Sequence, residues 1–302
     1  MRELNKIKLK DVLYIDIETS TTTAELDINS STFDAWAYSN RKNGETDQEL
    51  ADMYKKTGAL NPDFGRVVCI SVGMVSGTSF KTTTFNNIDE RTMIKEFYAM
   101  LDKFNGKYLC GHYIKGFDIP YIAKRGMINN LIPHDLVDTS AKKPWEMDWI
   151  IDTKELWQMG SYTRTSLITL TNILGVPSPK QDITGAEVPA YFWLNPKDHI
   201  KRISEYCERD VVAVYDVLKK LKNLGTVEEA KIEEETLIKS LFDGGPYGVK
   251  QVKELKDIFD KLDPEDREKG YVVLNAVSSA AKGKKTKITK AHIKKLKESY
   301  GK

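Results

Sequence analysis

Two carboxylates stand two residues apart inside an apolar run near the start of the 302-residue chain, residues 12–19 (VLYIDIET). Side chains two positions apart on a strand point to the same face, so Asp16 and Glu18 project together, roughly 6.6 Å apart along the strand. Two such charges on a mostly buried strand repel each other and carry a desolvation cost. The pair is interpreted either as solvated acids on an exposed edge strand or as ligands of a divalent cation.

Two further acids follow in positions that favour a shared site. Asp118 comes after an expected strand and stands at the entrance of an expected helix, where an aspartate also serves as a cap. Asp210 lies four residues after Tyr206 in a segment with helical periodicity, so both side chains share a face beside the apolar stripe. A tyrosine on an inward face is usually part of the core, but a buried aspartate needs a partner. Asp210 therefore favours a carboxylate cluster.

The composition describes a soluble globular chain, with 40% hydrophobic and 30% charged residues. No apolar run approaches the roughly 18 residues of a membrane-spanning helix, and no signal peptide is expected. Three dispersed cysteines, Cys69, Cys110 and Cys207, indicate buried thiols in a reducing cytosol and argue against disulfides or a zinc site. The last residues, 282–302, hold nine lysines against one acid. This end of the chain is either a solvated tail or a phosphate-binding patch.

The hydrophobic periodicity predicts three antiparallel strands, followed by a helix, a strand, a helix, a strand and further helices. The expected strands cover residues 12–19, 66–74, 78–85, 107–112 and 146–152, and the expected helices cover 89–104, 119–125, 154–158, 166–174 and 196–224. Residues 20–60 are expected to form a polar insertion with one short helix at 49–54, acting as a lid or as a surface loop. Residues 177–195 are expected to form an ordered loop.

This order of elements is that of the ribonuclease H-like α/β fold, with a mixed five-stranded sheet flanked by helices. Gly225 marks the expected domain boundary. The fold would occupy residues 1–225, and residues 226–302 would form a small helical, lysine-rich extension of unassigned role.

Three motifs in sequence order resemble the DEDD superfamily of 3′→5′ exonucleases (DnaQ-like). Their residues are Asp16 and Glu18, then Tyr113 to Asp118, then Tyr206 and Asp210. The resemblance covers roughly residues 8–224 and is nearest to the tyrosine-bearing (DEDDy) subfamily, which includes the proofreading domain of family B DNA polymerases and stand-alone bacterial and phage relatives. Glu205 occupies the position of the histidine in the other subfamily. Tyr113 departs from the usual asparagine of the second motif, which bears on substrate positioning and not on metal binding.

The resemblance implies a two-metal exonuclease that removes nucleoside 5′-monophosphates from the 3′ end of DNA, with single strands as the expected substrate. It implies two Mg²⁺ or Mn²⁺ ions held by Asp16, Glu18, Asp118 and Asp210, with Asp16 bridging them. Tyr206 would orient the attacking water, because a phenol of pKa near roughly 10 is a poor general base at neutral pH.

Substrate contacts are predicted at Thr19, Tyr113 and Phe117, and other aromatic residues are either stacking surfaces or core: Tyr162, Tyr191, Phe192 and Trp193. Two alternatives stay open, a catalytically impaired nucleic-acid-binding module and an RNA-directed exonuclease of the same chemistry. The expected setting is DNA replication or repair in a bacterial or phage-infected cytoplasm, away from membranes. A separate DNA polymerase or other replication protein would be recruited through residues 226–302.

Overall fold

The computed structural model describes residues 4–179 and 183–222. Its strands are β1 (Val12–Thr21), β2 (Gly65–Ser76), β3 (Ser79–Phe85), β4 (Tyr108–Gly111) and β5 (Ile150–Asp152). Its α-helices are α1 (Ser31–Asn40), α2 (Asp47–Thr57), α3 (Glu90–Leu101), α4 (Asp118–Ile128), α5 (Thr153–Gln158), α6 (Leu167–Leu174), α7 (Val188–Leu194) and α8 (Pro196–Leu221). The chain divides into a compact unit of residues 10–74 and 80–218 and a second unit of residues 1–9, 75–79 and 219–302. The first unit carries the features described below.

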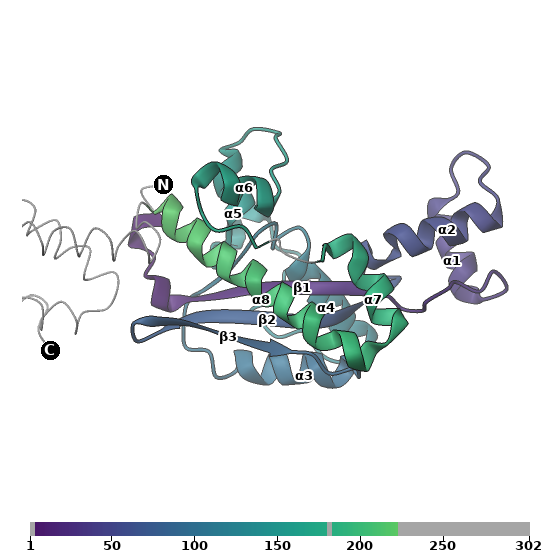
Figure 1. Ribbon diagram of the computed structural model, residues 1–302, viewed down its shortest axis with the longest axis horizontal. Coiled ribbons are helices and arrows are strands. Elements are labelled where there is room, and N and C mark those ends of the chain that lie inside the picture. The colour runs from purple at the N-terminus through teal and green to yellow at the C-terminus, as the bar shows by residue number, and fades with distance from the viewer. Residues whose placement is uncertain (1–3, 180–182, 223–302) are drawn as a thin grey trace, which may run out of the picture. The chain divides into compact units, whose positions relative to one another are not determined.

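One five-stranded sheet organises this unit, in the order β3-β2-β1-β4-β5. Figure 1 shows β3, β2 and β1 side by side. β1 pairs antiparallel with β2 and parallel with β4, and β4 pairs parallel with β5. The sheet is therefore mixed, with β1 at its centre, as expected for the ribonuclease H-like fold. Because β1, β4 and β5 are parallel, their carboxyl ends meet at one edge of the sheet.

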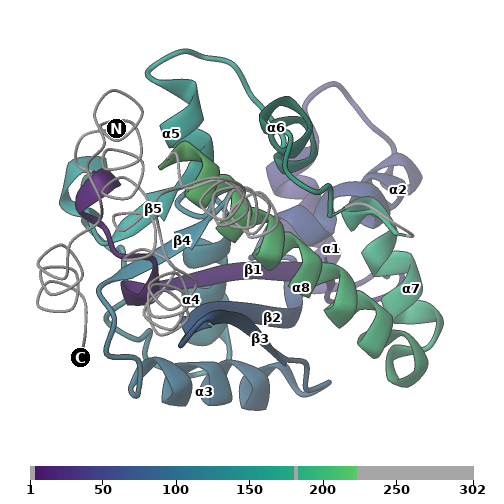
Figure 2. The ribbon, with the colours of Figure 1, turned by 60° about the vertical axis from the view of Figure 1, so that its left-hand side comes forward.

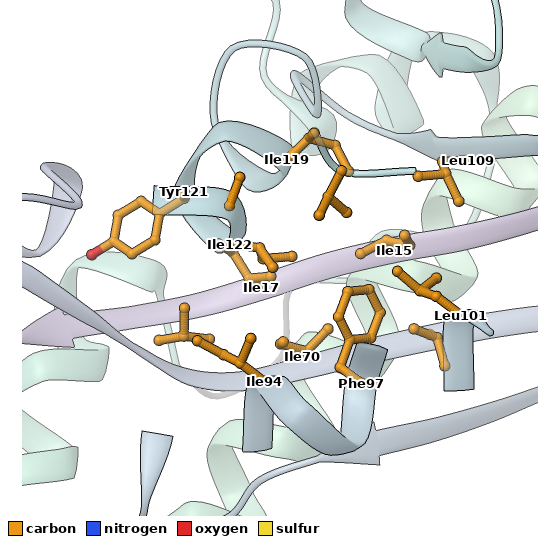
Figure 3. Close-up of a cluster of buried hydrophobic side chains, with 14 of the residues drawn as sticks. Ile15, Ile17, Ile70, Ile94, Phe97, Leu101, Leu109, Ile119, Tyr121 and Ile122 are labelled. Atoms are coloured by element: carbon orange, nitrogen blue, oxygen red, sulfur yellow. The ribbon is translucent and has the colours of Figure 1, made fainter. Parts of the chain in front are cut away.

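Alternate residues of β1 serve two different packing layers. Leu13, Ile15 and Ile17 belong to a buried cluster with side chains of α3 and α4, including Phe97 and Ile122 (Figure 3). On the other face Tyr14 makes edge contacts with Phe80 of β3 and Tyr215 of α8. A second buried cluster joins α7 and α8 to the β2 residues Val68 and Cys69. The sheet thus lies between α3 and α4 on one face and α7 and α8 on the other (Figure 2).

The insertion after β1 is more ordered than the sequence indicated. Instead of one short helix it holds α1 and α2 around their own buried cluster. Ser30 caps α1 by accepting from the N–H of Phe33, and Thr46 forms a capping box with Glu49 at the start of α2. The indole of Trp36 donates to the carbonyl of Leu50 at 2.8 Å and links the two helices. Both caps follow sequence patterns that are typical of helix starts, but the polar composition of the segment favoured the prediction of a loop.

Two other sequence predictions need correction. Residues 177–195 are not all loop, because α7 forms there with a proline in its first turn, a position that suits proline. Its residues Val188 and Phe192 are buried against β2. The strand expected at 146–152 contains only β5, since Pro144–Glu146 form a 3₁₀ turn before it.

Three further predictions concern the cysteines, membrane-spanning helices and the end of the chain. Cys69, Cys110 and Cys207 are buried free thiols, as predicted. No helix in the described part of the chain is long and apolar enough to cross a membrane. The extension expected at residues 226–302 lies outside the described residues.

A buried ion pair fixes α4 to its surroundings. The guanidinium of Arg125 donates to both carboxylate oxygens of Glu90 in α3, at 2.9 and 2.6 Å, and both side chains are under a tenth exposed. The same carboxylate accepts from the N–H of Val67 in β2 at 2.7 Å, while Arg125 also donates to the carbonyl of Pro62. This network ties α3, α4 and β2 together, and α4 begins with Asp118.

Replacing Arg125 with methionine should lower the free energy of unfolding by about 3–5 kcal/mol, because it leaves Glu90 buried without its cation. Urea denaturation measures the change as a lower midpoint at constant slope. The matched control is Lys124→Met, one residue away, whose exposed pair with Asp63 spans 3.8 Å and should cost less than about 1 kcal/mol. Similar losses in the two variants would show that the buried network does not anchor α4.

Candidate active site

β1 presents Asp16 and Glu18 on the face of the sheet that α8 covers. They alternate with the core residues Ile15 and Ile17, as the period-2 pattern predicts. The register with β2 shifts between Glu18 and Thr19, immediately after the second carboxylate. Such irregularities redirect side chains and are common beside active sites. The central strand therefore delivers two acids to one place.

Asp118 reaches these acids across an open edge of β1. The pairing between β1 and β4 ends at Tyr14, so β4 offers no partner to the N–H of Ile17. The carboxylate of Asp118, the first residue of α4, accepts that N–H at 3.1 Å. A backbone group that would otherwise be buried and unpaired thus holds the third acid in place.

α8 brings the fourth carboxylate and a phenol. Tyr206 and Asp210 lie one helical turn apart. Burial raises the pKa of Asp210, and a hydrogen bond from the Tyr206 hydroxyl to its carboxylate partly opposes that rise. Cys207, between them in sequence, donates its thiol to the carbonyl oxygen and to Oδ2 of Asp16, both at 3.3 Å. These contacts set α8 directly against β1 at the site.

The pKa of each of the four carboxylates is raised, and burial is the main cause for each. Burial raises the pKa of Asp16 and Glu18 well above their usual range, and the charges of Asp210 and Asp118 raise both further. Burial raises the pKa of Asp118 to about 7, with added repulsion from Asp152 and Asp210, and burial also raises that of Asp210 to about 7. The charges of the four predicted acids thus reach one another, and those of Asp210, Glu18 and Asp16 reach Tyr206. Of the four acids, Asp16 and Glu18 belong to the group of ligand atoms close enough to hold one metal ion, whereas Asp118 and Asp210 do not.

This donor set suits a divalent cation. In the described part of the chain, no lysine, arginine or histidine forms an ion pair with any of the four acids. Ligand atoms of Asp16, Glu18 and Cys207 all lie within 4.8 Å of one another. Carboxylate oxygens are the ligands that Mg²⁺ and Mn²⁺ prefer. The charge of Arg209 lowers the pKa of Asp210, but four acids beside this neighbouring cation still fit a site that is completed by metal.

The predicted substrate contacts lie in different surroundings. Thr19 and Phe117 both contact Tyr121, the first through a hydrogen bond to its hydroxyl and the second through a tilted ring contact at 5.2 Å. Tyr113 is 47% exposed and adopts a left-handed backbone with φ 64°, which is uncommon for a bulky residue. Of the other aromatic candidates, Tyr162 is fully exposed, whereas Phe192 is 1% exposed and is therefore a core residue.

Asp152, at the carboxyl end of β5, organises the loop between β4 and α4. It is buried, and its carboxylate accepts the backbone N–H groups of Tyr113, Lys115 and Lys154 at 2.9 to 3.2 Å. No individual role was predicted for this residue. Its position before Thr153 and Lys154 is nevertheless that of a helix cap, and it does cap α5. Its carboxylate also contributes to the raised pKa of Asp118, so the capped loop adjoins the site.

Two more residues at the site had no individual signal in the sequence. Cys207 was expected to be a buried thiol, and its hydrogen bonds to Asp16 depend on how α8 docks on β1. Gly185 lies so near the site that a Cβ there would be 4.0 Å from Oε2 of Glu18. Both residues lie more than 160 positions from β1 along the chain. Only the tertiary fold brings them close to its carboxylates.

Comparisons with known proteins give one family match. A family model described as a predicted 3′-5′ exonuclease related to the exonuclease domain of PolB matches residues 59–251. Among solved structures, the chain is similar to the family B DNA polymerase from the hyperthermophilic archaeon Pyrobaculum calidifontis, at 15% identity and a TM-score of 0.45. That similarity covers 70% of this chain and 27% of the polymerase chain. No curated protein sequence matches. The family match includes Asp118, Tyr206 and Asp210, whereas β1 precedes it.

The raised pKa values predict how pH affects the stability of the metal-free protein. Asp118 and Asp210 have folded pKa values of about 7, above their usual 3.8, so their protonated forms favour folding. The resulting stability is present at low pH and is lost as pH rises through about 7. The melting temperature in EDTA should therefore fall between pH 6 and pH 8, by about 2–4 °C for each kcal/mol lost.

Added Mn²⁺ should raise the melting temperature more at pH 8 than at pH 6, because the cation competes with protons for the same oxygens. The Asp118→Asn/Asp210→Asn variant serves as the control. In this variant, both the fall in melting temperature with pH in EDTA and the rise caused by Mn²⁺ should be smaller than in the wild type. Parallel pH profiles for the variant and the wild type would contradict the assignment of these shifts to the site.

Proposed function

Since the chain belongs to the family of predicted 3′-5′ exonucleases related to the exonuclease domain of PolB, we propose that it is a metal-dependent 3′→5′ exonuclease. The substrate would be the 3′ end of DNA, in single-stranded form, and the product a nucleoside 5′-monophosphate. The observation that carries this proposal is the meeting of four carboxylates from β1, α4 and α8, of which Glu18 and Asp118 are buried and Asp16 and Asp210 are half-buried. The pKa of each is raised.

The acids would act as ligands, and the tyrosine would act on the water. Asp16, Glu18, Asp118 and Asp210 would hold two divalent cations. When bound, such ions supply a nucleophilic hydroxide at neutral pH and stabilise the charge on the attacking and leaving oxygens. The chain's own contribution is to hold these oxygen ligands in a fixed, largely dehydrated arrangement before substrate arrives. The hydrogen bonds of Asp118 to Ile17 and of Cys207 to Asp16 support that preorganisation.

Tyr206 is suited to orienting water and unsuited to removing a proton from it. Burial and the nearby charges of Asp210 and Glu18 raise the pKa of its phenol above the usual value. The hydroxyl therefore stays protonated at neutral pH, and its hydrogen bond to Asp210 fixes where its oxygen points. A phenol held in this way can accept a hydrogen bond from the attacking water and align it with the scissile phosphate.

The proposed setting is the replication or repair of DNA in the cytoplasm of a bacterium or a phage-infected cell. The description of the family, which relates it to the exonuclease domain of PolB, supports this role. A separate DNA polymerase is the proposed partner, with residues 226–302 as the proposed contact.

Alanine at Asp16 or Asp210 should reduce Mg²⁺-dependent release of mononucleotides from a 5′-labelled oligonucleotide by at least about 10²–10³-fold, because each substitution removes charge stabilisation from the transition state. Tyr206→Phe should slow release by up to about 10²-fold, because the water loses its alignment. It should also leave the Mn²⁺-induced rise in melting temperature nearly unchanged. Wild-type rates in either alanine variant would show that the site is assigned wrongly.

A matched set of substrates tests the polymer that the enzyme cuts. Single-stranded DNA, duplex DNA, duplex DNA with a 3′ mismatch and single-stranded RNA are incubated with Mg²⁺ and the protein. We expect single-stranded and mismatched DNA ends to be shortened fastest, because their 3′ nucleotides are unpaired and can enter the site as a single strand. RNA degraded faster than DNA would favour an RNA-directed exonuclease. Mg²⁺-independent binding without cleavage would favour the impaired binding module, an alternative to which the unusual Tyr113 lends some support.

A further inference from the structure

Lys154 and Tyr113 form a cation–aromatic pair at the carboxyl edge of the sheet. The ammonium of Lys154, in the first turn of α5, lies 3.4 Å from the centroid of the Tyr113 ring. The ring is also packed against Gly116, where an added Cβ would be 2.3 Å from a ring carbon. The ring is thus confined between a glycine and a cation. Such contacts stabilise a cation at a partly exposed position.

The charge of Lys154 is not neutralised by a neighbouring acid. Its neighbour Lys115 forms an ion pair with Glu155 at 2.8 Å. In the described part of the chain no carboxylate forms an ion pair with Lys154. A partly exposed cation that rests on an aromatic ring keeps its charge available to an anion from solution.

The backbones of both residues are fixed by one carboxylate. Oδ1 of Asp152 accepts the N–H of Tyr113 and the N–H of Lys154, both at 2.9 Å. The charge of Asp152 reaches Asp118, so this pair stands beside the carboxylate site. β5 is the second neighbour of β1 in the sheet, which places its end roughly 10 Å from that of β1. Lys154 is therefore near the site but displaced from the four acids.

We propose that Lys154 binds an internucleotide phosphate of the substrate strand, upstream of the scissile one, and that Tyr113 positions its ammonium. This inference rests on the proposed exonuclease function. A strand that enters a site of four carboxylates needs cations along its path to offset repulsion of its phosphates. Asparagine, usual at position 113 in related motifs, adopts a left-handed backbone more readily but offers no ring face to a cation. The ring accounts for a tyrosine at φ 64°.

The first test is the salt dependence of binding to a fluorescent single-stranded DNA oligonucleotide, measured by anisotropy in EDTA so that hydrolysis does not interfere. Lys154→Ala should weaken binding roughly tenfold at low salt. It should also reduce the slope of log K against log salt by about 0.7, the value for one phosphate contact on a single strand. Lys142→Ala is the matched control, because Lys142 lies over the Trp149 ring at 5.3 Å but precedes β5 at its amino end.

The second test locates the phosphate. Oligonucleotides that carry a single uncharged methylphosphonate linkage, at each of the four positions nearest the 3′ end, are bound to the wild type and to Lys154→Ala. An uncharged linkage at one upstream position should weaken binding to the wild type. The same substitution should leave the affinity of Lys154→Ala unchanged. An equal loss in both proteins at every linkage would overturn the phosphate contact, as would an unchanged salt slope.

Tyr113 variants test the positioning role separately. Tyr113→Phe retains a ring face and should bind like the wild type, whereas Tyr113→Leu should reproduce the reduced slope and the insensitivity at the same linkage. Wild-type behaviour of Tyr113→Leu would overturn the role of the ring. Hydrolysis by the wild-type protein in Mg²⁺ is recorded in parallel. Failure to hydrolyse any oligonucleotide counts against the exonuclease function, whereas intact hydrolysis with an insensitive Lys154→Ala counts against this inference alone.

Discussion

The repulsion among four closely placed carboxylates, two of them buried and two half-buried, is the constraint around which this fold is arranged. Burial raises the pKa of all four acids, and the charges of Asp118 and Asp210 raise those of Asp16 and Glu18 further. The charge of Arg209 lowers the pKa of Asp210 but does not offset its burial. Such an arrangement opposes folding unless protons or divalent cations neutralise it. The surrounding core must therefore be stable enough to hold the acids together. The cluster of β1, α3 and α4 on one face and that of α7 and α8 on the other supply this stability.

Hydrogen bonds to otherwise unpaired groups give the site its geometry. Asp118 takes the place of a missing strand partner at Ile17, and Cys207 ties α8 to the backbone and carboxylate of Asp16. The ion pair of Glu90 with Arg125 keeps α4 in position behind these contacts. Asp16, Asp118 and Asp210 each accept a hydrogen bond from a neutral donor, at the place where we propose that divalent cations bind.

The loop between β4 and α4 connects the carboxylates to the pair of Lys154 and Tyr113, at which we propose that a substrate phosphate binds. Asp152 fixes this loop by accepting several backbone N–H groups. The same residue sets the start of α5, from which Lys154 reaches the Tyr113 ring. One buried acid thereby couples the position of Asp118 to that of a solvent-facing cation. This pair also explains why position 113 holds a tyrosine in place of the usual asparagine, because only the tyrosine offers a ring face to the ammonium of Lys154.

Local periodicity was enough to predict much of this protein from its sequence. A period of two placed Asp16 and Glu18 on one face of a strand, and a spacing of four placed Tyr206 and Asp210 on one face of a helix. The same patterns indicated the five strands, whereas the polar composition around α1 and the prolines around α7 concealed helices that packing against a core stabilises. Only the tertiary structure decided which groups meet: Asp118 with Ile17, Cys207 with Asp16, and Lys154 with Tyr113. These contacts join segments 41 to 191 residues apart, or depend on a loop geometry set by Asp152, and local sequence carries no information about such distances.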